Sequence, residues 1–191
     1  MFRTERWEYR ITLSDVDRGI NIDKTVVVSR HPSETTQHLV LRLLAYCFLY
    51  DDSLVFGTGV SADDEPDLCG KDLTGHLSLW VGCGDITADI AKRVVQHNAD
   101  AKAHAVFPSL ESLDAFLVRV GHWVKPPKNW GHLTVWVPPV QVLEHLEHLE
   151  SVRQRWVVTL VGGQMYIEVD GVVMDGVVTR IVAPNGAAKQ A

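Results

Sequence analysis

The chain has 191 residues, of which 46% are hydrophobic and 22% charged, and its formal net charge is -6. This size and apolar content suit one globular domain, and the negative charge excludes a general attraction to nucleic-acid phosphates or anionic lipids. The first residues are charged and no apolar run approaches about 18 residues, so neither a secretory signal nor a membrane span is predicted. Three cysteines without a C-x-x-C pair indicate neither a disulfide framework nor a zinc site, which favours a cytoplasmic location.

The first part of the chain predicts a β-hairpin followed by a helix. Residues 7–14 and 20–29 have the apolar alternation of strands and are separated by a polar, glycine-containing turn. A helix is predicted over residues 33–50, with Ser33 as its cap and Glu34 near its positive end. Its apolar residues extend beyond one stripe, which indicates a helix buried on more than one side.

Strands and helices alternate through the middle of the chain. Strands are predicted at residues 54–58, 76–82, 102–107 and 133–137, and helices at 86–97, 110–120 and 140–150. Asp85 is placed to cap the helix at 86–97, and Ser109 opens the helix at 110–120. This order predicts parallel strand pairing and an α/β core.

The end of the chain predicts an antiparallel β extension. Its strands are expected at residues 156–161, 165–169 and 172–181. Gly162-Gly163 and Asp170-Gly171 supply the positive φ angles that two-residue hairpin turns require.

An acidic stretch lies ahead of the strand at 76–82. Asp63, Asp64, Glu65 and Asp67 place four carboxylates within five positions, which repel one another unless they remain in water or share a cation. One interpretation is a solvated, proline-broken surface turn. The other is a metal site at the rim of a sheet, where loops often supply oxygen ligands.

Two further groups of residues are candidates for binding. Lys125-Pro126-Pro127-Lys128 is a stiff basic loop and a candidate nucleic-acid contact. His145 and His148 lie among glutamates on the helix at 140–150, which fits either a solvated face or a metal site, and the amphipathic pattern favours the former.

Several motifs together resemble the YaeQ family over nearly the whole chain. They are RHPSET at 30–35, LRLLA at 41–45, DDEPDL at 63–68, KDLTG at 71–75, Leu79-Trp80 and the strand at 133–136. That family is similar in fold to the PD-(D/E)XK nuclease superfamily. The resemblance implies a restriction-endonuclease-like core, a mixed sheet flanked by helices, to which this chain adds the N-terminal β-hairpin and the C-terminal antiparallel β extension. Residues 1–183 would form this one domain, and residues 184–191 a loose tail.

The resemblance also implies a site. In nucleases of that fold, an Asp on one strand and an acid on the next hold a divalent metal, and a Lys two residues later positions water. Asp67, which follows a proline, matches the first part and is the main catalytic and metal-binding candidate, with Mg²⁺ as the implied ion. Asp64, Glu65 and Glu34 are the further candidate metal ligands. Lys71 is the second candidate catalytic residue, as a source of positive charge.

The second part of the nuclease motif is not matched. By register with the family, the expected acids fall at Ser78 and Gly82, and Trp80 stands where the Lys is expected. Loss of carboxylates lowers the affinity of a site for a divalent cation.

Two functions follow from this partial match. The first is a nuclease-like fold whose degenerate metal site leaves a binding or scaffold module, with an unidentified protein or weakly bound nucleic acid as partner. The alternative is a Mg²⁺-dependent nuclease or phosphodiesterase acting on nucleic acid.

Overall fold

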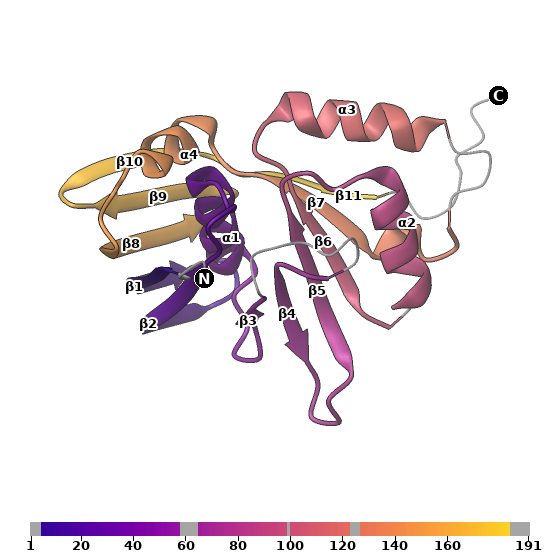
Figure 1. Ribbon diagram of the computed structural model, residues 1–191, viewed down its shortest axis with the longest axis horizontal. Helices are drawn as coiled ribbons and strands as arrows, with labels where there is room; N and C mark the ends of the chain where they lie inside the picture. Colours follow the sequence, from indigo (N-terminus) through magenta and orange to yellow (C-terminus); the bar gives the residue numbers. More distant parts are fainter. Residues whose placement is uncertain (1–4, 58–64, 99, 123–126, 184–191) are drawn as a thin grey trace.

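The computed structural model describes residues 5–57, 65–98, 100–122 and 127–183 (Figure 1). Within these residues the strands form two mixed sheets, which together with the flanking helices make one α/β fold. Sheet A has the spatial order β10 (Val172–Val177), β9 (Gln164–Val169), β8 (Arg153–Val161), β1 (Glu5–Asp15), β2 (Ile20–Arg30). Sheet B has the order β11 (Thr179–Val182), β7 (Leu133–Val137), β6 (Lys102–Val106), β5 (Leu77–Cys83), β4 (Leu68–Lys71), β3 (Val55–Phe56). The helices are α1 (Thr36–Phe48), α2 (Ala88–His97), α3 (Leu110–Gly121), α4 (Val140–Glu147) and the short 3₁₀ helix η1 (Trp130–His132).

Sheet A brings the N-terminal hairpin together with strands from the C-terminal part of the chain. The predicted N-terminal hairpin is confirmed as the antiparallel pair β1 and β2, and the C-terminal extension as β8, β9 and β10. The two predicted turns are confirmed by positive φ angles, 58° and 77° at Gly162 and Gly163 and 51° and 79° at Asp170 and Gly171. The two halves meet because β8 runs parallel to β1, a pairing the sequence pattern does not indicate.

Sheet B contains the predicted parallel strands β5, β6 and β7. Strand β4 was not predicted, because its four residues are too few to show an alternation. It pairs antiparallel with β5 through a turn in which Asp72 Oδ1 accepts hydrogen bonds from the backbone amides of Thr74 at 2.8 Å and His76 at 3.0 Å. The acidic stretch therefore leads into a short hairpin, and not directly into β5.

The strand predicted at 172–181 is divided between the two sheets. Its first part, β10, is the edge of sheet A, and its second part, β11, pairs with β7 at the edge of sheet B. The break falls at Val178, whose amide donates to the Gly163 carbonyl at 2.9 Å. The strands consequently form two mixed sheets where the sequence analysis expects one.

Two of the predicted helix caps are wrong. Thr35, and not Ser33, caps α1 by accepting from the His38 amide at 3.1 Å, since the Ser33 hydroxyl lies 2.7 Å from the His31 ring. Thr87, and not Asp85, caps α2. The predicted cap of α3 is confirmed, because Ser109 accepts from the Ser112 amide in a capping box.

Helix α1 lies between the two sheets (Figure 1). Every residue from Leu39 to Phe48 is buried, and one core cluster unites α1 with the inner face of sheet A, including Trp7, and with Val81 and Val106 of sheet B. Helices α2 and α3 cover the opposite face of sheet B over a second cluster that includes Trp80. Since α1 is enclosed on both sides from Leu39 to Phe48, a polar residue in that stretch, such as Arg42, must find its partners inside the protein.

Among the described residues, none of the helices combines the length and the apolar character that crossing a bilayer requires.

Candidate functional site

Asp67 is fixed at the start of β4 by its own backbone. Its N–H donates to the Val81 carbonyl at 2.8 Å, and its carbonyl accepts from the Gly57 N–H at 2.8 Å. The residue is 4% exposed, so its carboxylate is buried and does not belong to a solvated turn. A buried carboxylate requires compensating donors or cations.

The compensating groups come from α1 and the turn before it. His38 Nε2 lies 3.3 Å from Asp67 Oδ1, and His38 Nδ1 lies 2.8 Å from Glu34 Oε1. Arg42 Nη1 donates to the same Glu34 oxygen at 3.0 Å, and Arg42 Nη2 donates to the Gly57 carbonyl at 2.8 Å. The side chains of Glu34 and Arg42 are fully buried, so these four residues form an internal network, which we call the Asp67 network.

His38 carries a proton in this network at neutral pH. Burial lowers the pKa of His38, but its contacts with the Asp67 and Glu34 carboxylates outweigh burial and raise the pKa from its ordinary 6.5 to about 9. Two cations, the His38 imidazolium and the Arg42 guanidinium, therefore face two carboxylates. The Asp67 network is neutral as a whole, which is how a buried cluster of charges becomes tolerable.

The carboxylate oxygens of the Asp67 network do not converge on a common position that a metal ion could occupy. Glu34 and Asp67 contact opposite nitrogens of the His38 ring, so the ring separates the two carboxylates. Asp67 Oδ2 accepts a hydrogen bond from the Cys83 amide at 2.7 Å, which occupies its other oxygen. Among the described residues, no group of three or more His, Cys, Asp or Glu side chains is arranged to hold a metal ion.

The other candidate site residues lie apart from this network. Glu65 is exposed, and Asp64 lies outside the described residues, as does Lys125 of the basic loop. Lys71 is exposed at the far end of β4, four residues or roughly 13 Å of strand from Asp67. The structure therefore brings Glu34 to Asp67 but does not bring Lys71 there.

Ser78, Trp80 and Gly82, the three positions on β5 that depart from the nuclease motif, have different surroundings. Ser78 lies five residues, roughly 16 Å, before Cys83, whose amide binds Asp67. Trp80 is buried on the side of sheet B that faces α2 and α3. A Cβ atom at Gly82 would collide with the Trp80 ring and lie 2.5 Å from Ile86 Cδ1, so an acidic side chain has no room there.

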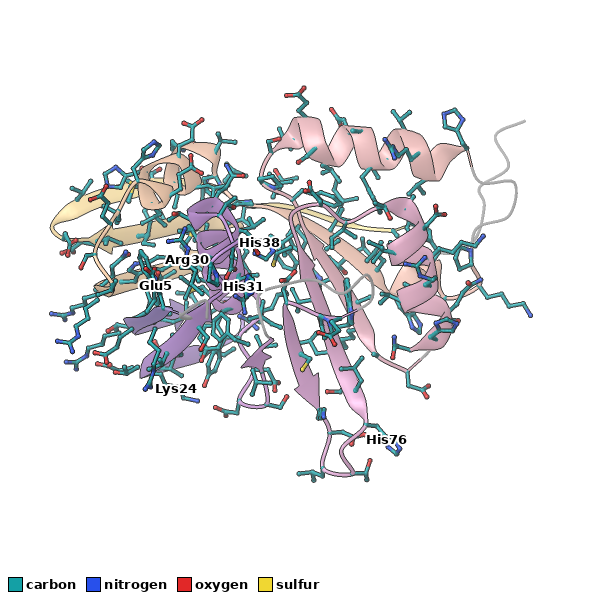
Figure 2. All side chains as sticks on the ribbon, viewed as in Figure 1. Glu5, Lys24, Arg30, His31, His38 and His76 are labelled. Atoms are coloured by element: carbon teal, nitrogen blue, oxygen red, sulfur yellow. The ribbon has the colours of Figure 1, made fainter. Side chains whose placement is uncertain are left out.

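His38 and Arg42 were missed in the sequence analysis. Glu34, His38 and Arg42 recur at intervals of four, which places His38 and Arg42 one above the other on α1 and Glu34 below them in the turn before it. Polar residues at this spacing on an otherwise apolar helix were the signal that they share partners. Figure 2 shows His38 near the junction of the two sheets and His76 far from it at the tip of the β4–β5 hairpin.

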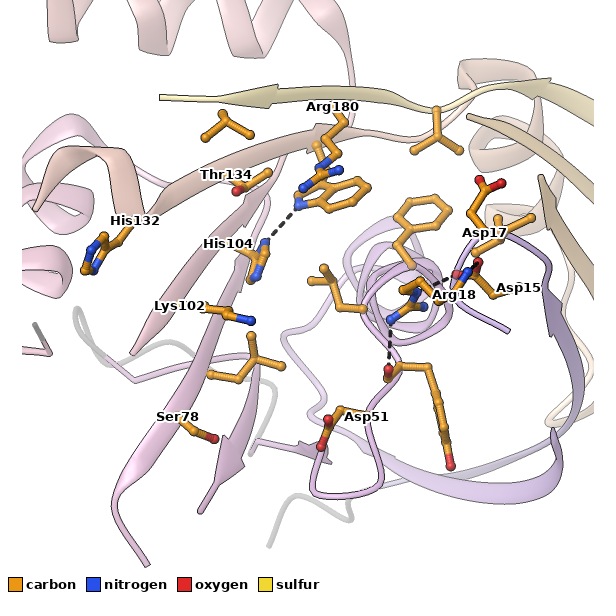
Figure 3. A pocket seen from close by; sticks show the side chains of 18 of the residues that line it. Asp15, Asp17, Arg18, Asp51, Ser78, Lys102, His104, His132, Thr134 and Arg180 are labelled. Carbon is orange, nitrogen blue, oxygen red and sulfur yellow. Dashed lines mark hydrogen bonds and ion pairs between the residues drawn. The ribbon is translucent and has the colours of Figure 1, made fainter. Parts of the chain in front are cut away.

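A second polar region is a cavity of about 1040 Å³ between the two sheets (Figure 3). Phe48 at the C-terminal end of α1 and Tyr50 just after the helix line it together with residues of β5, β6, β7 and β11. Asp67 is not among its lining residues. Phe48 lies ten residues beyond His38, roughly 15 Å along the helix axis, so the cavity and the Asp67 network lie toward opposite ends of α1.

The fold and the network define an α/β protein with two mixed sheets, a central buried helix and a charge-compensated carboxylate site. The profile of the family described as YaeQ protein matches residues 3–176, and the chain belongs to that family. The proteins named "Uncharacterized protein YaeQ" in Escherichia coli (strain K12) and Salmonella typhi are each 36% identical to it over 74 residues. That stretch covers 39% of this chain and 41% of each relative.

Two crystal structures of YaeQ proteins resemble the whole fold. The protein from Xanthomonas axonopodis pv. citri aligns with a TM-score of 0.80 at 26% identity, covering 95% of this chain and 100% of that one. The protein from Pseudomonas syringae aligns with a TM-score of 0.79 at 26% identity, covering 96% and 98%. This chain therefore shares its overall fold with these two YaeQ proteins.

Proposed function

We propose that this chain is a nuclease-like fold with a degenerate metal site, and that it acts as a binding or scaffold module. The observation that carries this proposal is the engagement of Asp67 by the protein itself. One oxygen accepts from the Cys83 amide at 2.7 Å, and the other lies 3.3 Å from His38 Nε2. Together, His38 and Arg42 supply the two positive charges that a divalent ion would supply.

This arrangement works against metal-dependent cleavage. A divalent ion at Asp67 has to displace the protonated His38 and the Cys83 amide, and it has to be dehydrated as well. Trp80 stands where the nuclease motif has the Lys that orients water, and it is buried in an apolar cluster. The engagement of Asp67 works against binding of the ion that would stabilise the leaving oxygen, and Trp80 replaces the group that would activate water. Both changes affect the cleavage reaction, and neither weakens the fold.

A restriction-endonuclease-like core is part of the same proposal. It is supported by the antiparallel pair β4 and β5, the parallel strands β5 to β7, and the helices on both faces of sheet B. We take residues 1–183 as one domain because α1 shares its core cluster with both sheets.

The alternative function is a Mg²⁺-dependent nuclease. Asp67 and Glu34, helped by Asp64 and Glu65, would hold the ion, and Lys71 would supply positive charge. The observation that favours it is that two buried carboxylates lie on either side of one imidazole ring, so a movement of His38 would bring both within reach of a shared cation.

Cleavage assays separate the two functions. Mg²⁺- and Mn²⁺-dependent cleavage of single- and double-stranded DNA and RNA is measured for the wild type, Asp67→Asn and Ser78→Glu. Asp72→Asn is the matched control, because Asp72 is an exposed acid in the β4–β5 turn. We expect no turnover in any of them. Robust wild-type turnover that is abolished by Asp67→Asn and kept by Asp72→Asn would overturn the proposal.

Binding of nucleic acid is expected to be weak. The net charge of -6 leaves local basic groups such as Lys128 to meet the phosphates. Affinity for duplex DNA should therefore be low and fall steeply as salt is added, because binding that rests on phosphate contacts depends on counterion release.

A further inference from the structure

One wall of the inter-sheet cavity is built from basic and donor side chains. Lys102 and His104 come from β6, Thr134 from β7 and Arg180 from β11. His104 pairs in register with Thr134, and Arg180 with Trp136, so three adjacent strands of sheet B present these groups on the same face. Figure 3 shows them along one side of the cavity. We call Lys102, His104, Thr134 and Arg180 the basic wall.

Side chains of the basic wall carry hydrogen-bond donors that the described residues do not use. Neither Lys102 nor Arg180 has a carboxylate within ion-pair distance among the described residues. Thr134 is 7% exposed, and its hydroxyl has no hydrogen-bond partner within the part of the chain that the structure describes. A nearly buried hydroxyl and two cations therefore line a cavity in which their bonding capacity is unused by the protein.

His104 adds a donor whose position is set by its neighbour. The indole N–H of Trp136 donates to His104 Nδ1 at 3.0 Å, so the proton of the neutral ring lies on Nε2. The residue is 9% exposed and lines the cavity, and Nε2 has no bonded partner among the described residues. Burial, and after it the charges of Arg180 and Lys102, lower the pKa of His104 to about 4. The ring therefore stays neutral and offers one N–H.

The acids across the cavity have partners of their own. Asp15 forms an ion pair with Arg18 at 2.6 Å, and Asp17 accepts from the Gly162 amide at 2.8 Å. Asp51 accepts from the amide and the hydroxyl of Ser53. Asp100, which also lines the cavity, has no such bond among the described residues. Of these acids only Asp15 is paired with a cation, because the donors to Asp17 and Asp51 are neutral amide and hydroxyl groups. An anion is therefore favoured at the basic wall, where the cations without ion-pair partners lie, and not elsewhere in the cavity.

The cavity also has an apolar part. The Trp136 ring contacts Phe48, with ring centroids 6.1 Å apart, and also the Arg180 guanidinium, 5.2 Å from its centroid. A cation–π contact of this kind uses the face of the guanidinium charge and no N–H group, so the N–H groups of Arg180 are available for bonds to an oxyanion. Leu49 and Leu79 line the cavity beside these groups. A volume of about 1040 Å³ is large enough for a small organic molecule, and the lining combines these apolar residues with a larger number of polar and charged ones.

We propose that this cavity binds a small organic anion, whose phosphate or carboxylate group contacts Lys102, His104 and Arg180 and whose apolar body packs against Phe48 and Leu79. The inference rests on the proposed function, because it names what a binding module of this fold would bind. Its location is independent of the Asp67 network, which lies toward the other end of α1.

Calorimetric titration of the whole chain with four probes tests the inference. Phenyl phosphate and benzoate carry the two candidate anions on the same ring, phenol carries the ring without the charge, and inorganic phosphate carries the charge without the ring. We expect saturable 1:1 binding of phenyl phosphate or benzoate, with phenol and inorganic phosphate each at least about tenfold weaker. The tighter of the two anions identifies the head group.

Substitutions locate the site. Arg180→Gln and Lys102→Gln each remove one charge from exposed positions of the wall and should weaken binding about tenfold without unfolding the protein. Arg153→Gln, an exposed arginine on β8 outside the cavity, is the matched control and should change affinity less than twofold, roughly the size of a screened surface charge effect. Thermal unfolding of each variant checks that it is folded.

Two results would overturn the inference. One is no saturable binding of either anion up to about 10 mM. The other is binding that both wall variants retain, or that Arg153→Gln weakens equally. Neither result bears on the degenerate metal site, whose failure would appear as metal-dependent cleavage that requires Asp67.

Discussion

Arg42 Nε lies 3.9 Å from Asp67 Oδ1, at a point where both side chains are buried. This nitrogen has no hydrogen-bond partner in the described residues, so the contact is coulombic and not a hydrogen bond. Arg42 thus stabilises two buried carboxylates in different ways. It attracts Asp67 through its charge, and it donates a hydrogen bond to Glu34 Oε1 from Nη1 at 3.0 Å. The guanidinium is the group on which the neutrality of the network depends.

Arg42→Met should therefore be strongly destabilising. It leaves Glu34 and Asp67 buried with less compensation and leaves the Gly57 carbonyl without its donor, so we expect a loss of about 3–5 kcal/mol in the free energy of unfolding. Urea denaturation measures it. Arg153→Met on β8 is the control and should cost less than about 0.5 kcal/mol. A loss below about 1 kcal/mol for Arg42→Met would show that the guanidinium is not needed.

Protonation of His38 should make stability depend on pH. The pKa of His38 in the folded protein is raised from 6.5 to about 9, so folding favours its charged form. Its contribution is complete below pH 6.5 and is lost as pH rises through about 9, and it amounts to at most about 3 kcal/mol. Denaturation at pH 6 to 9.5 should show this decline in the wild type and in His145→Gln. In His38→Gln the decline should be absent.

The pKa itself can be read from the imidazole signals of His38 in an NMR titration. A midpoint near or below 6.5 would contradict the charge assignment of the network.

Gly82→Ala should destabilise the protein because of crowding. The added Cβ collides with the Trp80 ring and lies 2.5 Å from Ile86 Cδ1, which forces repacking between β5 and α2 at a cost of about 1–3 kcal/mol. Gly121→Ala at the end of α3 is the matched control, since its Cβ meets nothing within 4 Å. It should be neutral or stabilising. Equal unfolding midpoints for the two variants would count against the described packing.

Reactivity of the thiols should distinguish Cys69 from the other two cysteines. Burial raises the pKa of Cys47 to about 12 and that of Cys83 well above its ordinary value, and both side chains are enclosed. Cys69 on β4 is partly exposed. A disulfide reagent at neutral pH should modify one thiol in the folded protein and three after denaturation. Cys69→Ser should abolish the native reaction, and fast reaction in that variant would disprove the burial of the others.

Local patterns were enough to predict much of the fold. The turns at Gly162-Gly163 and Asp170-Gly171 follow from residues that tolerate positive φ, and β5 to β7 follow from apolar strands alternating with helices. Pairing between distant strands leaves no local trace, which is why β8 beside β1 was not foreseen. The split at Val178 was missed for the same reason, since residues 172–181 read as one continuous strand.

The site was predictable in part. The acidic stretch was expected either to stay in water or to share a cation, and Asp67 is buried beside two cationic side chains, His38 and Arg42. The sequence did not identify these two residues as the partners, because they reach Asp67 from another element. The cap at Thr35 was missed because Ser33 is an equally good acceptor in sequence, and its bond to His31 decides between them.

The parallel pairing of β1 with β8 affects how the chain folds during its translation. The register runs from Glu8 beside Arg153 to Asp15 beside Leu160, so the N-terminal hairpin gains its neighbour only after most of the chain has been translated. At about 5–20 residues per second, the ribosome takes on the order of ten seconds to reach that strand. Until then one edge of β1 is open and the apolar face that carries Ile11 and Leu13 lacks its full cover. Nascent chains should therefore be retained by chaperones that shield open sheet edges, until β8 emerges and closes the sheet.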